Sequence, residues 1–496
     1  MNSEKKRAAT IKTVLYIVIS TLSLMLSPLV VENYRYFNAI LLLFVAVGGY
    51  FFIVFSIATQ NWLDIRSVFH LVWIFTIMLA SLQLAEYQED WQVKTWLCMA
   101  GAYAMFQIGA NLGMNFGKRQ TSKVLRSFSK IKIGRVSFSM HQERLFWICL
   151  GITLIGLVCF IINVIIRGYI PAFSNDPKAY ITFYTKLHVL SVAATAVPGL
   201  CYFVIKTQEI SIAKQFLMWL CIFYTTFLFP ILVVSRGTFV VAAISLTVSI
   251  FYLNGKKLWI LVMCVVVIAS VYGGVSALRG YTDAQLSEIF EPKVISRQNE
   301  NEETKVTEGT MQVQVPEAAE VTAEAVETKE TEKVFQLPAK WSFIYSYLTV
   351  SHDNFNEAVQ NSAQYTYGVR QLAPFNAIFG CSWIEETISS GEYYLVREHL
   401  NTTNLVGDAY YDLHEWGVLL FMLLWSFAFG IIQSFRGKTE GPISLIVLGN
   451  TMTPVALCFF ATWMSNFSLW LIWGTQLLIA IVASAQIESR TKKENT

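Results

Sequence analysis

The chain has 496 residues, of which 54% are aliphatic, aromatic or Cys and only 14% are charged, with a net charge of +3. A soluble domain carries roughly a quarter charged residues and a nucleic-acid-binding domain a large positive excess, so the composition excludes both classes. The charges are clustered, and the ranges 145–166 and 258–278 contain none. About 20 such residues form a helix that spans a bilayer. We therefore expect an all-α polytopic membrane protein.

The first predicted helix covers 13–31 and follows the basic residues Lys5, Lys6 and Arg7. Its apolar stretch is longer than that of a cleavable signal peptide and lacks a small-residue cleavage site, so we expect an uncleaved span. Hydropathy predicts about twelve transmembrane helices in all, with a turn near 463–468 between the last two. The predicted ranges are 13–31, 37–58, 67–85, 95–115, 145–166, 187–205, 215–235, 238–254, 258–278, 416–435, 442–462 and 468–487.

The distribution of Lys and Arg over the short loops favours a cytoplasmic N-terminus. With that assignment the inner segments hold 22 Lys and Arg residues and the short outer loops hold six, as the positive-inside rule requires. An even number of helices returns the C-terminus to the same side. The inner loop 116–144 contributes eight of these charges, which act either as a topology signal alone or as a polybasic site for anionic lipid headgroups.

We divide the chain into three parts. Residues 1–278 hold helices 1 to 9, 279–415 form a large extracytoplasmic loop, and 416–496 hold helices 10 to 12 and a cytoplasmic tail. Within the loop, 298–333 is rich in Glu, Thr and Val and has no aromatic residue, so we expect a disordered acidic insertion that buries no core. Aromatic residues alternate with polar ones over 334–415, which we expect to be ordered and packed on the membrane face.

Common soluble-enzyme motifs are absent, namely GxxxxGK[ST], GxGxxG, HExxH and GxSxG. Neither ATP hydrolysis nor a zinc or serine hydrolase is therefore supported. The eight cysteines show no zinc-type spacing, and only Cys381 lies in the large loop. We expect neither a metal site nor a cofactor.

Arg236 is the first candidate for a functional residue, because only 235–237 are available for the turn between two apolar ranges. Its guanidinium must lie at the outer interface or slightly below it, where an unpaired charge is costly. It either binds an anionic ligand such as a diphosphate with its fork of donors or reaches up to lipid headgroups.

Arg370 and Arg397 are further candidates in the large loop. They either supply cationic contacts to a pyrophosphate or sugar, or form surface salt bridges to Glu385, Glu392 or Glu398.

The loop also carries several groups that could transfer a proton from a sugar hydroxyl. Each is either a catalytic acid or base or an ordinary hydrogen-bonding loop residue. These groups are His352, Asp353, Glu398, His399, Asp408, Asp412, His414 and Glu415.

Four segments of the chain resemble those of the bacterial oligosaccharide repeat-unit polymerases of capsules and O-antigens, the Wzy type. They are SRGTFV at 235–240, GYIPAFS at 168–174, YTYGVRQLAPFNAIFG at 365–380 and NTTNLVGDAYYDLHEWG at 401–417. The HEW at 414–416 departs from the family's shorter spacing. The resemblance extends over nearly the whole chain, since the family also has ten to fourteen helices and a large late outer loop.

The resemblance implies a GT-C-like inverting glycosyltransferase of the bacterial cell membrane. Its donor would be a growing glycan on polyprenyl diphosphate, its acceptor the next lipid-linked repeat unit, and its leaving group polyprenyl diphosphate. It also implies a flippase and a chain-length regulator as protein partners, and no nucleic acid. Preorganised arginines would stabilise the leaving group in place of a metal ion. On this basis Arg236, Arg370, Arg397, Asn401 and Tyr410 bind substrate, and His399 or Asp412 is the base.

Three other functions are compatible with a polytopic chain. A lipid-linked oligosaccharide flippase should show charged residues within many spans and repeated halves, which this sequence lacks. An O-antigen ligase performs the same chemistry on a different acceptor, and sequence alone separates it poorly from a polymerase. A membrane O-acyltransferase would place a histidine inside an apolar span, whereas His70 and His188 lie near predicted helix ends.

Overall fold

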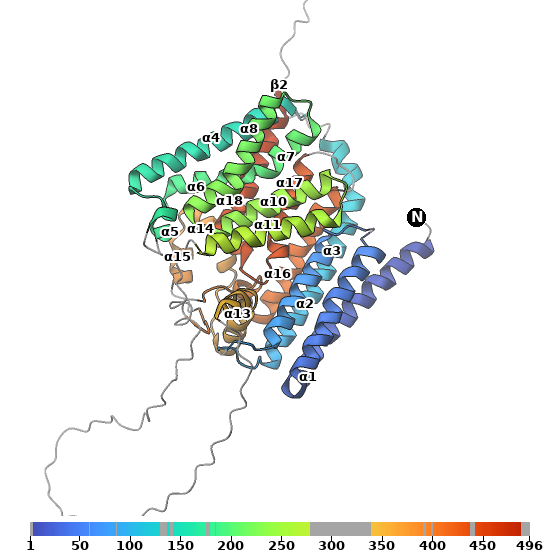
Figure 1. Cartoon of the computed structure of the whole chain (residues 1–496). Helices are drawn as coiled ribbons and strands as arrows, with labels where there is room; N and C mark the ends of the chain where they lie inside the picture. Colours follow the sequence, from blue (N-terminus) through green and yellow to red (C-terminus); the bar gives the residue numbers. More distant parts are fainter. Residues whose placement is uncertain are drawn as a thin grey trace, which may run out of the picture.

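The computed structural model of the chain is a bundle of helices (Figure 1). The predicted insertion 298–333 and the candidate base His399 lie outside the described residues. The described residues are 3–58, 60–85, 87–128, 136–138, 142–174, 179–183, 185–277, 339–389, 393–397, 400–436 and 442–487.

Helices form nearly all of the described secondary structure, as predicted. In the first half these are α1 (Ser3–Ser56), α2 (Ile65–Ser81), α3 (Val93–Phe128), α4 (Gln142–Arg167), η1 (Pro171–Phe173), α5 (Ala179–Thr182), α6 (Lys186–Ala193), η2 (Ala194–Ala196), α7 (Pro198–Thr207), α8 (Ile212–Phe223), η3 (Tyr224–Leu228), α9 (Phe229–Val233) and α10 (Arg236–Leu253). In the second half they are α11 (Leu258–Ala277), α13 (Ala339–Asn361), η4 (Arg370–Leu372), α14 (Ala373–Phe379), α15 (Ser382–Ser389), α16 (Gly407–Arg436), α17 (Pro442–Ala456), η5 (Trp463–Ser465) and α18 (Phe467–Ser484). Two short strands, β1 (Val136–Phe138) and β2 (Ala485–Ile487), pair antiparallel.

Six helical stretches in the described part of the chain are long and apolar enough to cross a membrane, and three shorter apolar helices accompany them. The first stretch carries two of the predicted ranges, because a non-helical residue, Tyr34, separates two arms of α1 that fold back on each other (Figure 1). Every one of the twelve predicted ranges overlaps a helix. The chain is therefore a membrane-embedded helical protein.

Contacts between loops sort them into two ends of the bundle that agree with the predicted sides. At one end Arg35 pairs with Asp90 at 3.2 Å and Lys94 pairs with Glu415 at 2.6 Å, and all four residues belong to predicted outer segments. At the other end β1, from the predicted inner loop 116–144, pairs with β2 next to the C-terminal tail. Helix α13 and β2 accordingly lie at opposite ends of the bundle (Figure 1).

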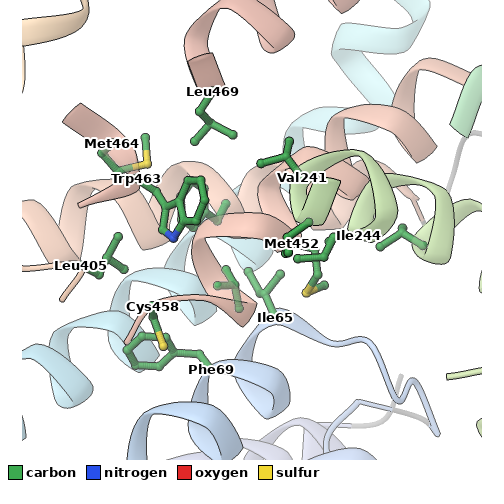
Figure 2. Close-up of a cluster of buried hydrophobic side chains, with 14 of the residues drawn as sticks. Ile65, Phe69, Val241, Ile244, Leu405, Met452, Cys458, Trp463, Met464 and Leu469 are labelled. Atoms are coloured by element: carbon green, nitrogen blue, oxygen red, sulfur yellow. The ribbon is translucent and has the colours of Figure 1, made fainter. Parts of the chain in front are cut away.

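A continuous apolar core joins helices that are far apart in sequence (Figure 2). Phe69 of α2, Val241 of α10 and Met452 of α17 are all almost completely buried within it, together with Leu405 and Trp463. Leu405 lies just before α16, and Trp463 lies just after α17. The core therefore reaches the segments next to the candidate site residues of the large loop.

Small residues let α3 and α16 pack in close contact. Gly109, Gly113 and Gly117 are spaced four residues apart on α3 and face α16. A Cβ at Gly113 would collide with the carbonyl oxygen of Phe427, and one at Gly430 with that of Ala110. This small-xxx-small spacing is typical of close helix pairs in membranes.

The helix predicted over 187–205 is broken in the structure into α6, η2 and α7. Pro198 begins α7 and has no N–H to continue the preceding helix. The carbonyl oxygen of Ala196, left over by the break, accepts a hydrogen bond from Gln476 of α18 at 3.1 Å. Gln476 in turn accepts from Asn450 of α17 at 2.7 Å. Buried side chains thus supply hydrogen bonds to a backbone carbonyl that has no water available inside the membrane.

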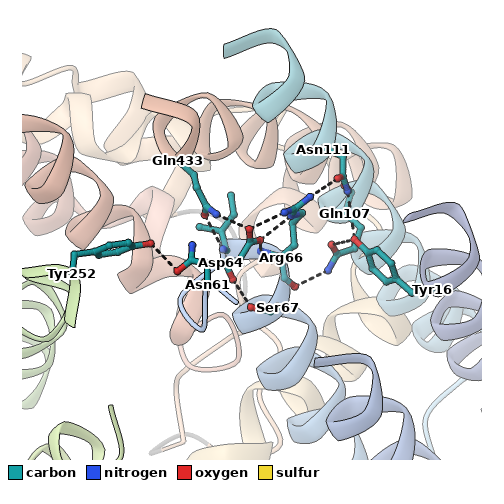
Figure 3. Close-up of polar contacts among 10 residues, drawn as sticks. Tyr16, Asn61, Asp64, Arg66, Ser67, Gln107, Asn111, Tyr252 and Gln433 are labelled. Atoms are coloured by element: carbon teal, nitrogen blue, oxygen red, sulfur yellow. Dashed lines mark hydrogen bonds and ion pairs between the residues drawn. The ribbon is translucent and has the colours of Figure 1, made fainter. Parts of the chain in front are cut away.

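One cation assigned to the inner surface is instead buried (Figure 3). Arg66 forms a two-pronged ion pair with Asp64, with donor–acceptor distances of 2.8 and 2.7 Å, and also donates to Asn111. Gln433 of α16 donates to the same Asp64 carboxylate at 2.8 Å. Arg66 therefore links α2, α3 and α16 at the predicted inner end, and its charge is already neutralised there.

Candidate functional site

Helix α13 ties the large loop to the bundle through Asp353, one of the predicted acid or base groups. Its carboxylate accepts hydrogen bonds from the Trp91 indole N–H and the Gln88 amide, both at 2.9 Å. Tyr345, two turns earlier, donates to Gln88 at 2.8 Å. Desolvation by burial raises the pKa of Asp353 to about 7. All of these partners are protein groups, so Asp353 anchors α13.

The neighbouring histidine is also an anchor. His352 is fully buried, with Nε2 2.9 Å from the Thr76 hydroxyl and Nδ1 3.2 Å from the Asn404 amide. Desolvation lowers its pKa to about 3, so the ring is neutral at physiological pH. It joins α2 to the segment just before α16.

Asn354 binds the backbone next to Arg397. Its amide donates to the carbonyl oxygens of Leu400 at 2.5 Å and Thr402 at 2.7 Å, and its side-chain oxygen accepts from the N–H of Val396 at 2.9 Å. One buried side chain therefore fixes the backbone on both sides of Arg397.

Arg370 lies at the centre of the candidate site, at the start of η4. It is 2% exposed, although it is a long charged side chain in a predicted loop. The guanidinium carbon lies 4.1 Å from the ring centre of Tyr393 and 4.3 Å from that of Tyr411. The cation is therefore enclosed by two aromatic rings, and cation–π contacts of this kind hold an arginine in a buried place.

Asp412 holds the turn that carries Arg370. Its Oδ1 accepts from the N–H of Arg370 at 3.1 Å and the Thr366 hydroxyl at 2.6 Å, and its Oδ2 accepts from the N–H of Gln371 at 3.2 Å. Asp412 is completely buried. The structure thus brings two predicted site residues together, and here Asp412 positions Arg370.

Asp408, one turn before Asp412, lies on the other side of Arg370. Its buried carboxyl is close to the hydroxyls of Thr462 and Ser465 and within electrostatic reach of Arg370. Tyr393 donates to its Oδ1 at 3.4 Å. These contacts combine a carboxyl, a cation and two hydroxyls in one place.

Arg236 begins α10, directly after a break in the helix predicted over 215–235. The π-helix η3 leads into α9, which ends at Val233. Val234 follows with a left-handed φ of 55° that turns the chain, and the Ser235 side chain then caps α10 by accepting from the N–H of Thr238. Arg236 is 9% exposed, and its guanidinium carbon lies 4.7 Å from the ring centre of Tyr347 on α13. The arginine is therefore enclosed by the loop helix.

Arg236 and Arg370 are each linked through one neighbouring side chain to the same segment, residues 457–465 after α17. The ring of Tyr347, which lies against Arg236, stacks on Phe460 with centres 5.9 Å apart. The hydroxyl partners of Asp408, which lies within electrostatic reach of Arg370, come from the same segment. Two arginines predicted from separate motifs thus share this segment as a common neighbour.

The other predicted substrate-binding residues lie further from this centre. Arg397 is half-buried beside the ring of Tyr87 at 5.8 Å, and Asn401 is exposed. Tyr410 is fully buried against Phe355 and lies 5.5 Å from the ammonium of Lys94. Tyr410 is thus part of the packing under the site.

A small pocket with a mostly apolar lining begins next to Arg370. Gln371 lies at its polar end, and its walls come from α3, α16 and the segments before α16 and around η5. The lining residues include Phe106, Ala409, Phe421, Trp425 and Met464.

Sequence reasoning missed the hydroxyls of Thr462 and Ser465 and the anchoring role of α13. The sequence did contain a signal for this role of α13, the run SHDNFN at 351–356. Five of these six residues are polar, and polar side chains that become buried in an aromatic segment need hydrogen-bond partners. Among the residues the structure describes, no three His, Cys, Asp or Glu side chains form a group suited to a metal ion.

No protein-family model, curated protein or solved structure matches the chain.

Proposed function

We propose that the chain polymerises polyprenyl-diphosphate-linked oligosaccharide repeat units into a surface polysaccharide at the outer face of a bacterial cell membrane. A hydroxyl of the acceptor unit attacks the anomeric carbon of the donor glycan. The new glycosidic bond forms as the bond to the diphosphate oxygen breaks, and polyprenyl diphosphate departs with inversion. The acceptor proton passes to a base. The donor's own phosphate bond supplies the driving force.

The arrangement of Arg236 and Arg370 carries this proposal. Both are buried against aromatic rings and are linked through a neighbouring side chain to the segment 457–465, at the end of the bundle that the charge pattern assigns to the outside. Buried cations are retained where an anion uses them, because their desolvation is costly. Two such cations match the two phosphates of the leaving group, whose negative charge grows in the transition state.

Asp408 fits the role of the base better than Asp412. The Asp412 carboxylate accepts from two backbone N–H groups and so holds the turn of Arg370, whereas the partners of Asp408 are side-chain hydroxyls, which can rotate, and Arg370 lies within electrostatic reach. A base next to the diphosphate-binding cation would meet the acceptor hydroxyl as it approaches the anomeric carbon.

The same proposal includes an architecture of about twelve crossings of GT-C-like type with both termini in the cytoplasm. Support comes from the helices found over all twelve predicted ranges and from the grouping of loops at two ends. The break before α10 supports it further, because interrupted helices in membrane proteins commonly border ligand sites.

Deletion of the gene followed by gel analysis of the surface polysaccharide tests the function. A polymerase mutant retains a single repeat unit on lipid and loses the ladder of longer chains. Lipid-linked units trapped inside the cell would instead identify a flippase. Full-length polymer left on the carrier would identify a ligase.

Complementation with Arg236→Ala tests the site. We expect chain extension to fall by about 10²–10³-fold, the usual effect of removing a donor that stabilises transition-state charge. Arg167→Ala is the matched control, because Arg167 is an exposed arginine at a predicted outer helix end. Normal polymer length from Arg236→Ala at normal protein level would remove Arg236 from the mechanism.

A further inference from the structure

Four aromatic rings form a ladder from the buried start of α16 to the outer surface. Tyr410 stacks on His414 with ring centres 4.9 Å apart, His414 on Tyr365 at 4.0 Å, and Tyr365 on Tyr367 at 5.8 Å. Tyr410 is fully buried, whereas Tyr365 is 47% and Tyr367 78% exposed. The ladder therefore ends in flat aromatic surface that the protein does not cover.

Backbone conformation at two positions of the ladder is unfavourable. Tyr367 has a φ of 50° and His414 a φ of 49°, in the left-handed region that bulky residues rarely adopt. Each such residue costs on the order of 1 kcal/mol or more and persists only where its surroundings hold it. Glycine would adopt the same turn at position 367 without strain, so packing does not explain a tyrosine there.

Hydrogen bonds hold the exposed rings in place. The N–H of Thr366 donates to the carbonyl oxygen of Tyr411 at 3.1 Å, and the N–H of Tyr367 donates to that of Asp412 at 3.0 Å. The same turn continues to Arg370, whose N–H donates to the Asp412 carboxylate. One rigid turn thus carries the exposed rings at one end and the buried arginine at the other.

Charged groups border the ladder. Lys94 and Glu415 form an ion pair at 2.6 Å, with each side chain 43% exposed, and Lys94 also lies against the ring of Tyr410. The ion pair therefore marks the Tyr410 end of the ladder as polar. An exposed flat ring at the other end suits a saccharide, whose C–H face packs on the electron-rich ring and whose hydroxyls stay in water. If lipid chains covered this surface instead, the Lys94–Glu415 ion pair would lose its water and gain no other hydrogen-bond partner.

We propose that Tyr367, the outermost ring of the ladder, is a stacking platform for one saccharide ring, and that Tyr365 and His414 support it from beneath. The inference deepens the proposed polymerase function, on which it rests for the identity of the glycan. Because the turn joins this subsite to Arg370, the bound ring belongs to the sugar portion near the diphosphate.

Binding of a free oligosaccharide to purified protein tests the subsite. The probe is the repeat-unit oligosaccharide released by mild acid from the lipid-linked intermediate of the producing cells, titrated by calorimetry against the full chain in detergent. We expect Tyr367→Ala to weaken binding about 5- to 10-fold, since stacking of one ring contributes on the order of 1 kcal/mol. Tyr367 is mostly exposed, so the variant should fold normally.

Three further variants sharpen the result. Tyr365→Phe keeps the ring and should bind like the wild type, whereas Tyr365→Ala should not. Trp383→Ala removes another exposed aromatic side chain of the loop, 52% exposed on α15, and should leave binding unchanged. Equal binding by the wild type and Tyr367→Ala, or no binding by the wild type, would overturn the subsite.

The test separates the subsite from the reaction. The protein could bind the oligosaccharide through Tyr367 while deletion of its gene gives the flippase pattern on the gel. That result would support the subsite and contradict the polymerase function. The reverse pattern, a lost ladder with no ring-dependent binding, would keep the polymerase and reject the subsite.

Discussion

Individual buried polar residues do most to hold the outer loop against the bundle. Asp353 makes two hydrogen bonds to residues more than 260 positions earlier in the chain, and His352 and Asn354 each join segments from different parts of the chain. A buried hydrogen bond contributes about 1 kcal/mol when made, and an orphaned partner costs more. Removing any of these three side chains should therefore loosen the segment that carries Arg397.

The pKa of Asp353 predicts a pH dependence of stability. Burial raises this pKa to about 7, whereas an exposed Asp titrates near 3.9, so the folded protein retains a proton that the unfolded chain has lost. Stability conferred by this group should therefore fall as pH rises from about 4 to about 7, by at most about 1.4 kcal/mol per pH unit.

Thermal unfolding in detergent between pH 5 and pH 8 measures this effect. Asp353→Asn cannot ionise, so we expect its melting temperature to fall less across this range than that of the wild type. Asp90→Asn, in the same outer region but on an exposed carboxylate, should follow the wild-type profile. Parallel profiles for Asp353→Asn and the wild type would show that Asp353 does not titrate in this range.

Whole helices were predictable where the signal is local, and their interruptions were not. Runs without charge identify the helices because the membrane selects for them residue by residue. The break at 194–197 depends on Gln476 reaching the carbonyl of Ala196 from 280 residues away, and no local pattern announces that contact. The same limit applies to the site: arginines at 236 and 370 stand out in the sequence, but the rings enclosing them and the role of Asp412 follow from distant partners.

Close packing of α3 on α16 predicts the effect of adding one methyl group. Gly113→Ala would drive a Cβ into the carbonyl of Phe427, so we expect a loss of about 1–3 kcal/mol and a lower melting temperature. Gly151→Ala on α4 is the matched control, because nothing lies within 4 Å of its added Cβ and alanine favours the helix. An unchanged melting temperature for Gly113→Ala would mean that the two helices can separate slightly without loss.

At the scale of the whole molecule, the assignment of sides can be tested with thiol reagents. A membrane-impermeant maleimide should label the half-exposed native Cys381 of the large loop in spheroplasts. In a Cys381→Ser background, Lys257→Cys, between α10 and α11, should react only after the membrane is permeabilised. The opposite pattern would place Arg370 and the whole candidate site in the cytoplasm and end the proposed function.

The anchoring of α13 determines when the site can exist during synthesis. Its side chains bind α2 and the segment before α3, which leave the ribosome early, and Ser351 also donates to the carbonyl of Phe459, which leaves it much later. The large loop must therefore wait undocked until α17 has been synthesised. Any truncation before that helix should yield an inserted chain without a docked loop, exposed to envelope proteases.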